Sequence, residues 1–258
     1  MRTVRQLYRY PVKGLSAEPL TEVALRAGEG VPLDRQWALT NGSWTFDAGS
    51  YTPRPKTDFI ALMDHAALAS LATRYDDADN CLHVSAPDGR HLRIDVDDPA
   101  ACGGLARFIA QHINARLEGP PAFVSGEGFR FTDVSVLSHG MMNAVSLINL
   151  ATVREVGAAL GTDIDPMRFR ANIYMDGGEP WEESSWLDRE VTVGEVRARV
   201  VMRTPRCSAT NVNPVTAERD MTLPATMMER YGHRELGVYL QVLDGGAIAP
   251  GAVVTPLP

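Results

Sequence analysis

The sequence contains little cysteine and no long hydrophobic run. Its three cysteines (Cys81, Cys102 and Cys207) are too few for a Cys₄ iron–sulfur cluster, and no Cys-x-x-Cys pair is present for a structural zinc. Such scattered cysteines do not form a disulfide framework and fit a reducing compartment, so we expect a cytoplasmic protein. No apolar stretch approaches the roughly 18–20 residues that a membrane-spanning helix needs.

Nucleotide-binding motifs are missing as well. There is no Gly-x-Gly-x-x-Gly and no Walker-type phosphate loop, so neither a dinucleotide site nor an NTP site is indicated. Lys+Arg 25 against Asp+Glu 32 gives the 258-residue chain a formal net charge of −7, and this charge does not suggest nucleic-acid binding. The first residues lack the apolar region of a signal peptide. We therefore expect neither a nucleic-acid partner nor a membrane partner.

Lysine is almost absent from the chain. Only Lys13 and Lys56 occur among the 25 basic residues, and arginine occupies the other positions. Nucleotide composition of the genome is one explanation of this skew. The other is that a compact, titratable ammonium is required at the positions where lysine remains.

What is present predicts a mainly β fold with peripheral helices, an α+β class. Short runs of β-branched, aromatic or alternating residues predict strands at 3–10, 20–26, 36–40, 59–63, 82–85, 92–96, 134–137, 145–148, 171–175, 190–193, 196–202, 209–212 and 238–243. Helical spacing predicts helices at 65–74, at 98–117 with Asp98 as its cap, and at 149–160 between Asn149 and Gly161. The Gly/Pro-rich segment 118–133 predicts a boundary between two packed β-barrel-like domains, 1–120 and 121–258.

A group of carboxylates follows the predicted boundary at some distance. Glu182, Glu183 and Asp188 lie beside Trp181 and Trp186 and could perform acid–base chemistry. A solvated loop anchored by two indoles is the simpler interpretation, and we expect that arrangement.

Cys207 has the most reactive setting of the three cysteines. It follows a Val-rich predicted strand and has Arg203 and Arg206 nearby. Positive neighbours favour the thiolate, which is both the nucleophilic and the metal-binding form. From these residues alone, a reactive and a structural role are equally supported.

Further cations stand at predicted strand ends. Arg168 and Arg170 precede a strand, and in extended geometry both would face one side and could clamp a phosphate, unless they form a surface pair. Lys13 follows a strand, with Gly14 beside it allowing a ligand to approach the backbone. Arg35 begins another strand. We expect Lys13, Arg35 and Arg170 to converge on one anion-binding pocket between the two domains.

Four motifs together resemble the MOSC domain family (molybdenum cofactor sulfurase C-terminal domain), preceded by its N-terminal β-barrel domain. The second domain is then expected to be Greek-key-like. The motifs are Tyr10-Pro-Val-Lys13-Gly14, Asp34-Arg35-Gln-Trp37, Arg168-Phe-Arg170-Ala-Asn172, and Arg206-Cys207 followed by Thr210 and Pro214.

The resemblance implies a molybdenum–pterin cofactor whose metal is ligated by Cys207, with Tyr239 near the metal. It implies that Lys13, Arg35 and Arg170 hold the pterin and its phosphate, and the matching motifs add the binding candidates Gly14, Arg168, Asn172 and Arg206. The implied activity is the reduction of N-hydroxylated compounds such as amidoximes or hydroxylamines. Because the chain offers no electron relay, a separate ferredoxin- or flavin-type donor is expected.

Two positions depart from the pattern of the relatives, which often carry serine where this chain has Gly14 and Pro205. Three other functions remain open. The protein could handle sulfur as a persulfide on Cys207, or it could hold the cofactor without turnover. Pyridoxal phosphate on Lys13 or Lys56 is the weakest, because no partner for the pyridinium can be named.

Overall fold

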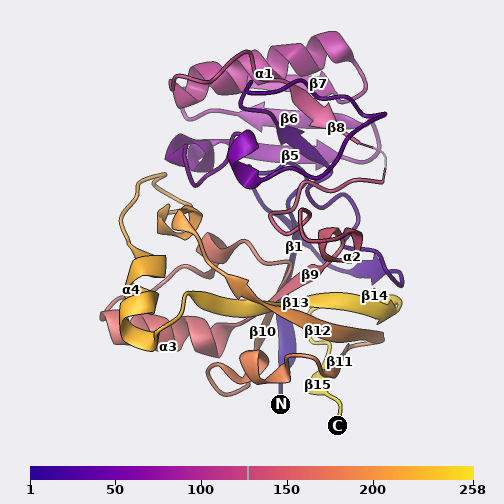
Figure 1. Cartoon of the computed structure of the whole chain (residues 1–258), viewed down its shortest axis with the longest axis vertical. Coiled ribbons are helices and arrows are strands. Elements are labelled where there is room, and N and C mark those ends of the chain that lie inside the picture. The colour runs from indigo at the N-terminus through magenta and orange to yellow at the C-terminus, as the bar shows by residue number, and fades with distance from the viewer. Residues whose placement is uncertain (127) are drawn as a thin grey trace.

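The computed structural model describes residues 1–126 and 128–258. Its largest element is a curled eight-stranded sheet with the order β15-β11-β12-β13-β9-β10-β1-β2, in the lower part of Figure 1. Its strands are β1 (Thr3–Arg9), β2 (Glu18–Leu20), β9 (Val145–Asn149), β10 (Ile173–Asp176), β11 (Glu190–Val193), β12 (Val196–Pro205), β13 (Glu235–Asp244) and β15 (Val254–Pro256).

Three smaller sheets complete the β structure. They are β5 (Ala72–Asp76) with β6 (Cys81–Ser85) and β7 (His91–Asp95), β4 (Trp37–Leu39) with β8 (Phe123–Ser125), and β3 (Val23–Leu25) with β14 (Gly246–Ile248). The helices are α1 (Pro99–Ile113), α2 (His139–Met142), α3 (Leu150–Leu160) and α4 (Leu223–Tyr231). In Figure 1, α1 covers β5, β6 and β7 at the top. The prediction of a mainly β fold with peripheral helices is confirmed.

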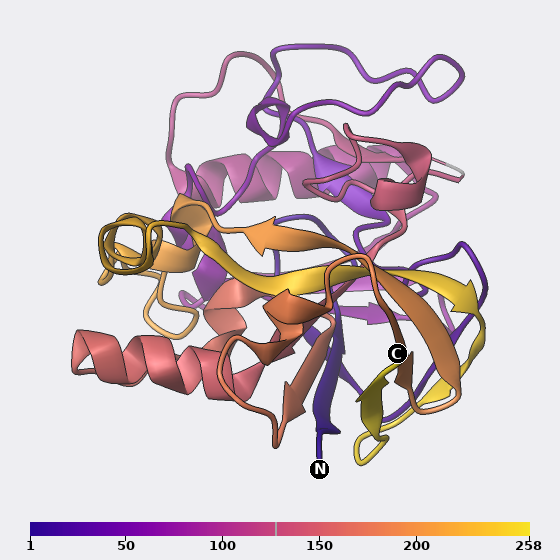
Figure 2. The ribbon, with the colours of Figure 1, turned by 60° about the horizontal axis from the view of Figure 1, so that its bottom comes forward.

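Strands from the N-terminal part of the chain pair with strands from the C-terminal part. Strand β1 pairs antiparallel with β10, and β3 pairs with β14 near the end of the chain. Both termini lie on one side of the molecule (Figures 1 and 2), where the Val254 amide donates to the Arg2 carbonyl at 3.0 Å. In Figure 2, α3 and α4 lie together beside the sheet. The two parts therefore cannot separate without breaking β ladders.

Alternation along the strands explains which face of the large sheet is buried. In β12, Val196, Ala198 and Val200 are buried in the main hydrophobic core. Arg197 and Arg199 point the other way and pair with acidic neighbours, among them Glu190 at 2.8 Å from Arg197 and 3.0 Å from Arg199. The period of two thus separates an apolar face from a charged one.

Local capping fixes the two longest helices where the sequence predicts them. The Asp98 carboxylate accepts from the Ala100 amide at 2.8 Å, and Pro99 occupies the first turn of α1. The Asn149 side chain accepts from the Ala151 amide at 2.9 Å, and Gly161 ends α3 in the left-handed region at φ 67°. A side-chain cap satisfies a backbone donor that the helix itself leaves unpaired. No helix among the described residues is long and apolar enough to cross a membrane.

Four predicted elements are wrong. The local pattern of these segments was ambiguous, and tertiary contacts determined their conformation. Residues 59–63 form no strand and share only an isolated bridge between Phe59 and Thr40. Residues 134–137 are a turn closed by the Leu137 amide on the Val134 carbonyl at 3.0 Å, and Leu137 is 59% exposed. Short apolar runs do not distinguish strands from buried or exposed irregular segments.

The other two errors concern short helices. Residues 65–74 split into a 3₁₀ helix and the start of β5, because Thr73 and Tyr75 alternate and pair with β6. Residues 209–211 lie in a 3₁₀ helix and not in a strand, and Val212 forms only an isolated bridge with Arg219. The 3₁₀ helices are Lys56–Asp58, Ala66–Ser70, Pro166–Phe169, Glu182–Trp186 and Ser208–Asn211. The predicted strand 20–26 is also divided, between β2 and β3.

The loop of carboxylates is partly buried, which corrects the expectation of a solvated loop. Trp186 anchors it and is 1% exposed, as expected, but Glu183 is fully buried. The Thr152 hydroxyl on α3 contacts both Glu183 carboxyl oxygens at 3.0 Å. Burial raises the pKa of Glu183 to about 7.

This raised pKa predicts a pH-dependent stability. The folded protein binds the Glu183 proton more tightly than the unfolded chain, so the stabilisation is complete below pH 4.5 and is lost as the pH rises through about 7. Relative to Glu183→Gln, wild type should lose about 3 kcal/mol of unfolding free energy between about pH 4.5 and 8. Urea unfolding of both proteins across this range measures the difference. Parallel curves would show that Glu183 does not titrate there.

Candidate functional site

A cavity of about 210 Å³ lies where the N-terminal part of the chain meets the large sheet. It is lined from both sides, by segments around Lys13 and Arg35 and by the ends of β12 and β13. All nine candidate site residues lie in its wall, namely Lys13, Gly14, Arg35, Arg168, Arg170, Asn172, Arg206, Cys207 and Tyr239. The structure thus brings together residues that are far apart in the sequence.

The cavity wall is positively charged, although the chain has a formal net charge of −7. Six basic residues line it (Lys13, Arg35, Lys56, Arg168, Arg170 and Arg206), against the two acidic residues Asp34 and Asp133. Clustered charge of one sign inside low-dielectric walls attracts ligands of the opposite sign. The cavity is therefore suited to an anion.

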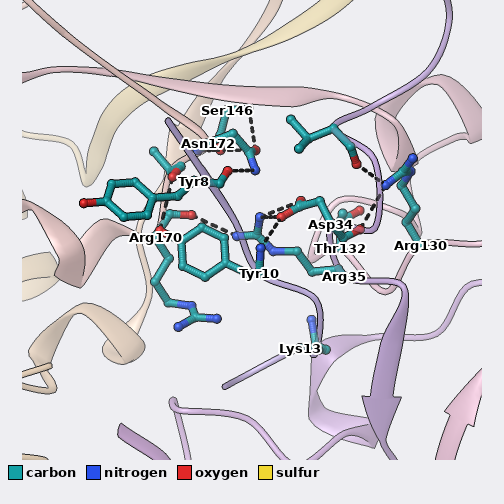
Figure 3. A network of polar contacts seen from close by, with 12 residues as sticks. Tyr8, Tyr10, Lys13, Asp34, Arg35, Arg130, Thr132, Ser146, Arg170 and Asn172 are labelled. Atoms are coloured by element: carbon teal, nitrogen blue, oxygen red, sulfur yellow. Dashed lines mark hydrogen bonds and ion pairs between the residues drawn. The ribbon is translucent and has the colours of Figure 1, made fainter. Parts of the chain in front are cut away.

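Arg35 is held rigidly by its neighbours (Figure 3). Its backbone lies in the left-handed region at φ 50°. One terminal nitrogen contacts both Asp34 carboxylate oxygens at 2.7 and 2.6 Å, and the other donates to the Arg170 carbonyl at 2.8 Å. Burial tends to lower the pKa of Arg35, but the charge and hydrogen bonds of Asp34, together with the neighbouring tyrosines, outweigh it and the pKa is raised. Arg35 is thus a permanent, oriented cation.

Arg170 is a half-buried cation without a carboxylate partner in the described part of the chain. Its guanidinium carbon lies 4.4 Å from the centre of the Tyr10 ring, and that of Arg35 lies 4.3 Å from the same ring. Within residues 1–126 and 128–258, the Arg170 side chain has neither a carboxylate partner nor a hydrogen-bond acceptor. Burial and the charge of Arg35 lower the pKa of Arg170 to about 10, which still leaves it charged at neutral pH. An anionic ligand would neutralise this group.

Two lysines meet on one carboxylate at the cavity wall. The Lys13 ammonium donates to the Phe131 carbonyl at 3.1 Å and pairs with Asp133, and Lys56 lies 3.5 Å from the other Asp133 oxygen. Burial alone would raise the pKa of Asp133, but the charges of Lys13 and Lys56 outweigh it and hold that pKa well below its usual value. Burial likewise opposes the charge on Lys56, but Asp133 and Cys207 raise its pKa. A charged Lys56 does not favour an imine with pyridoxal phosphate.

Arg168, Arg206 and Asn172 hydrogen-bond mainly to other groups of the protein. Arg168 pairs with Asp220 at 2.7 Å. Arg206 donates to the Phe169 and Leu236 carbonyls, both at 2.8 Å. The Asn172 amide oxygen accepts from the Ser146 hydroxyl at 2.8 Å and from its backbone amide at 3.1 Å. These three residues fix the cavity wall.

The predicted extended geometry of Arg168 and Arg170 is wrong. Pro166–Phe169 is a 3₁₀ helix, and Arg170 follows it with a left-handed backbone at φ 52°. Arg168 therefore engages Asp220, whereas Arg170 stacks on Tyr10. The two arginines do not form a parallel clamp.

Cys207 is a half-buried free thiol at the end of β12. Its carbonyl accepts from the Thr210 hydroxyl at 2.9 Å and from the Thr210 amide at 3.1 Å, which fixes the turn after the strand. Tyr239 lies on the neighbouring β13 opposite Met202, and burial raises the pKa of its phenol. The phenol therefore stays protonated near neutral pH.

The sequence did not identify three further polar residues of the wall as site residues. Asp133 ends the predicted boundary segment, where no pattern marks it. Thr204 contributes a hydroxyl that is buried and has no hydrogen-bond partner among the described residues. Lys56 is indicated in the sequence only by the scarcity of lysine and as a candidate for pyridoxal phosphate.

Comparison with known proteins gives two family matches that cover most of the chain. Residues 1–123 match the MOSC N-terminal beta barrel domain, and residues 134–255 match the MOSC domain. Mitochondrial amidoxime reducing component 2 of Homo sapiens is 24% identical over 96% of this chain and 82% of its own length. Molybdenum cofactor sulfurase of Drosophila grimshawi is 24% identical over 92% of this chain, which spans only 32% of that protein.

Among solved structures, the YUAD protein from Bacillus subtilis is similar along 98% of this chain and 94% of its own, with 12% identity and a TM-score of 0.43. Mitochondrial amidoxime-reducing component 1 of Homo sapiens is 21% identical over 89% of this chain and 72% of its own length. With both family domains present in order, the chain belongs to the MOSC family, as a MOSC N-terminal beta barrel domain followed by a MOSC domain.

Proposed function

We propose that this protein binds a molybdenum–pterin cofactor and reduces N-hydroxylated compounds. The observation that carries the proposal is a half-buried thiol, Cys207, in a cavity with six basic residues in its wall. The similarity to amidoxime-reducing components and to a molybdenum cofactor sulfurase supports it. Electrons would come from a separate ferredoxin- or flavin-type donor protein.

The residues of the cavity fit such a cofactor. A thiolate is the soft ligand that suits a sulfur-rich metal centre, and Cys207 would supply it. Lys13, Arg35 and Arg170 would hold the pterin and its phosphate, because charged donors bind phosphate oxygens strongly. The unpartnered hydroxyl of Thr204 could donate to the same group.

Gly14 replaces a frequent serine of the relatives, and its backbone explains why glycine is suited to this position. Its φ of +83° is strained for other residues, and an added Cβ would lie 3.2 Å from the Ile60 carbonyl oxygen. The bare backbone would let the cofactor approach closely. The surrounding cations would then donate the hydrogen bonds that a serine hydroxyl would otherwise provide.

The chain's own residues would orient the reaction. The bound group supplies the two-electron chemistry that removes oxygen from nitrogen. Tyr239, whose phenol stays protonated, would donate a hydrogen bond toward an oxygen in the cavity. Arg35 and Arg170 would balance the negative charge of the cofactor, and the half-buried position of Cys207 would limit access of water.

Turnover should require an external reductant. The balanced reaction is R₂N–OH + 2 H⁺ + 2 e⁻ → R₂NH + H₂O, and no electron relay was found in the sequence. We expect protein expressed in a cofactor-competent host to contain molybdenum and to reduce an amidoxime with a chemical reductant or a donor system. With NADH alone it should be inactive.

Metal analysis and turnover assays separate this proposal from its rivals. Activity with NADH alone would contradict the requirement for a separate donor. Bound molybdenum without turnover under any reductant would favour a cofactor-holding module. Protein without molybdenum but with persulfide on Cys207 would favour sulfur handling.

A further inference from the structure

The two lysines of the chain share one carboxylate in the cavity. Arginine fills every other basic position of the sequence, yet Lys13 and Lys56 both pair with Asp133. A uniform drift toward arginine would not keep both exceptions at one place. The coincidence indicates that the compact ammonium itself matters in this cavity.

The two ammonium groups differ in what they can still bind. Lys13 is 7% exposed, and its ammonium contacts the Phe131 carbonyl, Asp133 and the face of the Phe59 ring. Lys56 is 30% exposed and reaches Asp133 at 3.5 Å. Its remaining N–H groups are therefore available to a ligand. It lines the same cavity as Cys207.

The segment that carries Lys56 is held firmly. The Asp58 carboxylate pairs with Arg54 at 2.6 Å, and the Asp58 carbonyl accepts from the Trp44 indole at 3.1 Å. The Phe59 amide donates to the Lys56 carbonyl at 3.2 Å. The Trp44 and Phe59 rings pack with their centres 5.8 Å apart. The backbone that carries Lys56 is thus fixed beside the cavity, and only the end of its side chain can adjust.

We propose that Lys56 binds the substrate, donating a hydrogen bond from its ammonium to the oxygen of the N-hydroxyl group and holding that oxygen beside Cys207. This inference rests on the proposed function. Asp133 orients the ammonium through one carboxylate oxygen, and Lys13 pairs with the other oxygen. A guanidinium is larger and planar and would not place one donor at this point.

The first experiment uses metal-free protein and needs no turnover. Cys207 is alkylated with iodoacetate, which is anionic, and with iodoacetamide, which is neutral and of similar size, and each cysteine is followed by peptide mass spectrometry. Lys56→Met should lower the iodoacetate-to-iodoacetamide rate ratio at Cys207 about fivefold at low salt, because a neighbouring positive charge attracts the anion. Lys56→Arg should keep most of the ratio. Cys102, on α1, serves as an internal control in each sample.

The second experiment uses molybdenum-loaded protein. Lys56→Met should raise KM for an amidoxime about tenfold, the loss of roughly one hydrogen bond to a charged donor, with unchanged molybdenum content. Lys56→Arg should not restore KM, because the charge remains but the position of the donor does not. Arg74→Met, which removes an exposed cation outside the cavity wall, is the control and should keep the wild-type KM.

The outcomes separate this inference from the proposed function. An unchanged alkylation ratio in Lys56→Met would overturn the placement of Lys56 toward Cys207. An unchanged KM in that variant, or full recovery of KM by Lys56→Arg, would overturn the role of a compact donor. Absence of molybdenum in wild type would defeat the proposed function. The alkylation ratio would still decide whether the Lys56 ammonium faces Cys207.

Discussion

Replacing Cys207 by alanine is expected to lower bound molybdenum by more than about 100-fold, because loss of a direct ligand should exceed the 10–100-fold cost of losing an outer-shell partner. The fold should survive, since Cys207 is only half-buried and it is its backbone carbonyl, not its thiol, that accepts the hydrogen bonds from Thr210. Elemental analysis of purified protein, with circular dichroism as a check on folding, measures both effects.

Two internal controls accompany this substitution. Cys81→Ala and Cys102→Ala remove thiols that lie outside the cavity wall, so both variants should keep the metal. Loss of molybdenum in either of them, with retention in Cys207→Ala, would move the ligand to another cysteine. Retention in all three single variants would mean that the cofactor is held without a thiolate from this chain.

The second large effect is expected at Arg170. Arg170→Met should weaken cofactor binding about 10–150-fold, the equivalent of a charge-assisted contact of roughly 1.5–3 kcal/mol. The unfolding free energy of the metal-free protein should stay constant or rise. The reason is that the substitution removes a half-buried charge which has no carboxylate partner among the described residues and which Arg35 repels.

Arg168→Met provides the matched comparison, because the two arginines are two residues apart and differ in their partners. Arg168 is 3% exposed on its side chain and pairs with Asp220, so its loss leaves that carboxylate without its partner. We expect Arg168→Met to destabilise the protein by about 1–3 kcal/mol. Urea unfolding should therefore show the larger loss of stability for Arg168→Met, and cofactor content should show the larger loss for Arg170→Met. Equal stability losses would refute the assignment of Arg170 as the free cation.

The sequence by itself determined those features that depend on neighbouring residues. Asp98 and Asn149 cap α1 and α3 because each side chain reaches an amide two residues further along. The alternation in β12 set its buried face. Four short motifs, none specific alone, were enough to indicate the family and eight of the residues that line the cavity.

Only the tertiary structure decided how the cavity residues are used. Arg168 and Arg170 look equivalent in the sequence, but a 3₁₀ turn directs one to Asp220 and the other to Tyr10. Lys56 and Asp133 meet because an aromatic cluster holds the Lys56 segment over the cavity, and no local pattern encodes that contact. Short-range preferences fix backbone caps and alternation, whereas charge partners across a cavity depend on packing between segments that are distant in the chain.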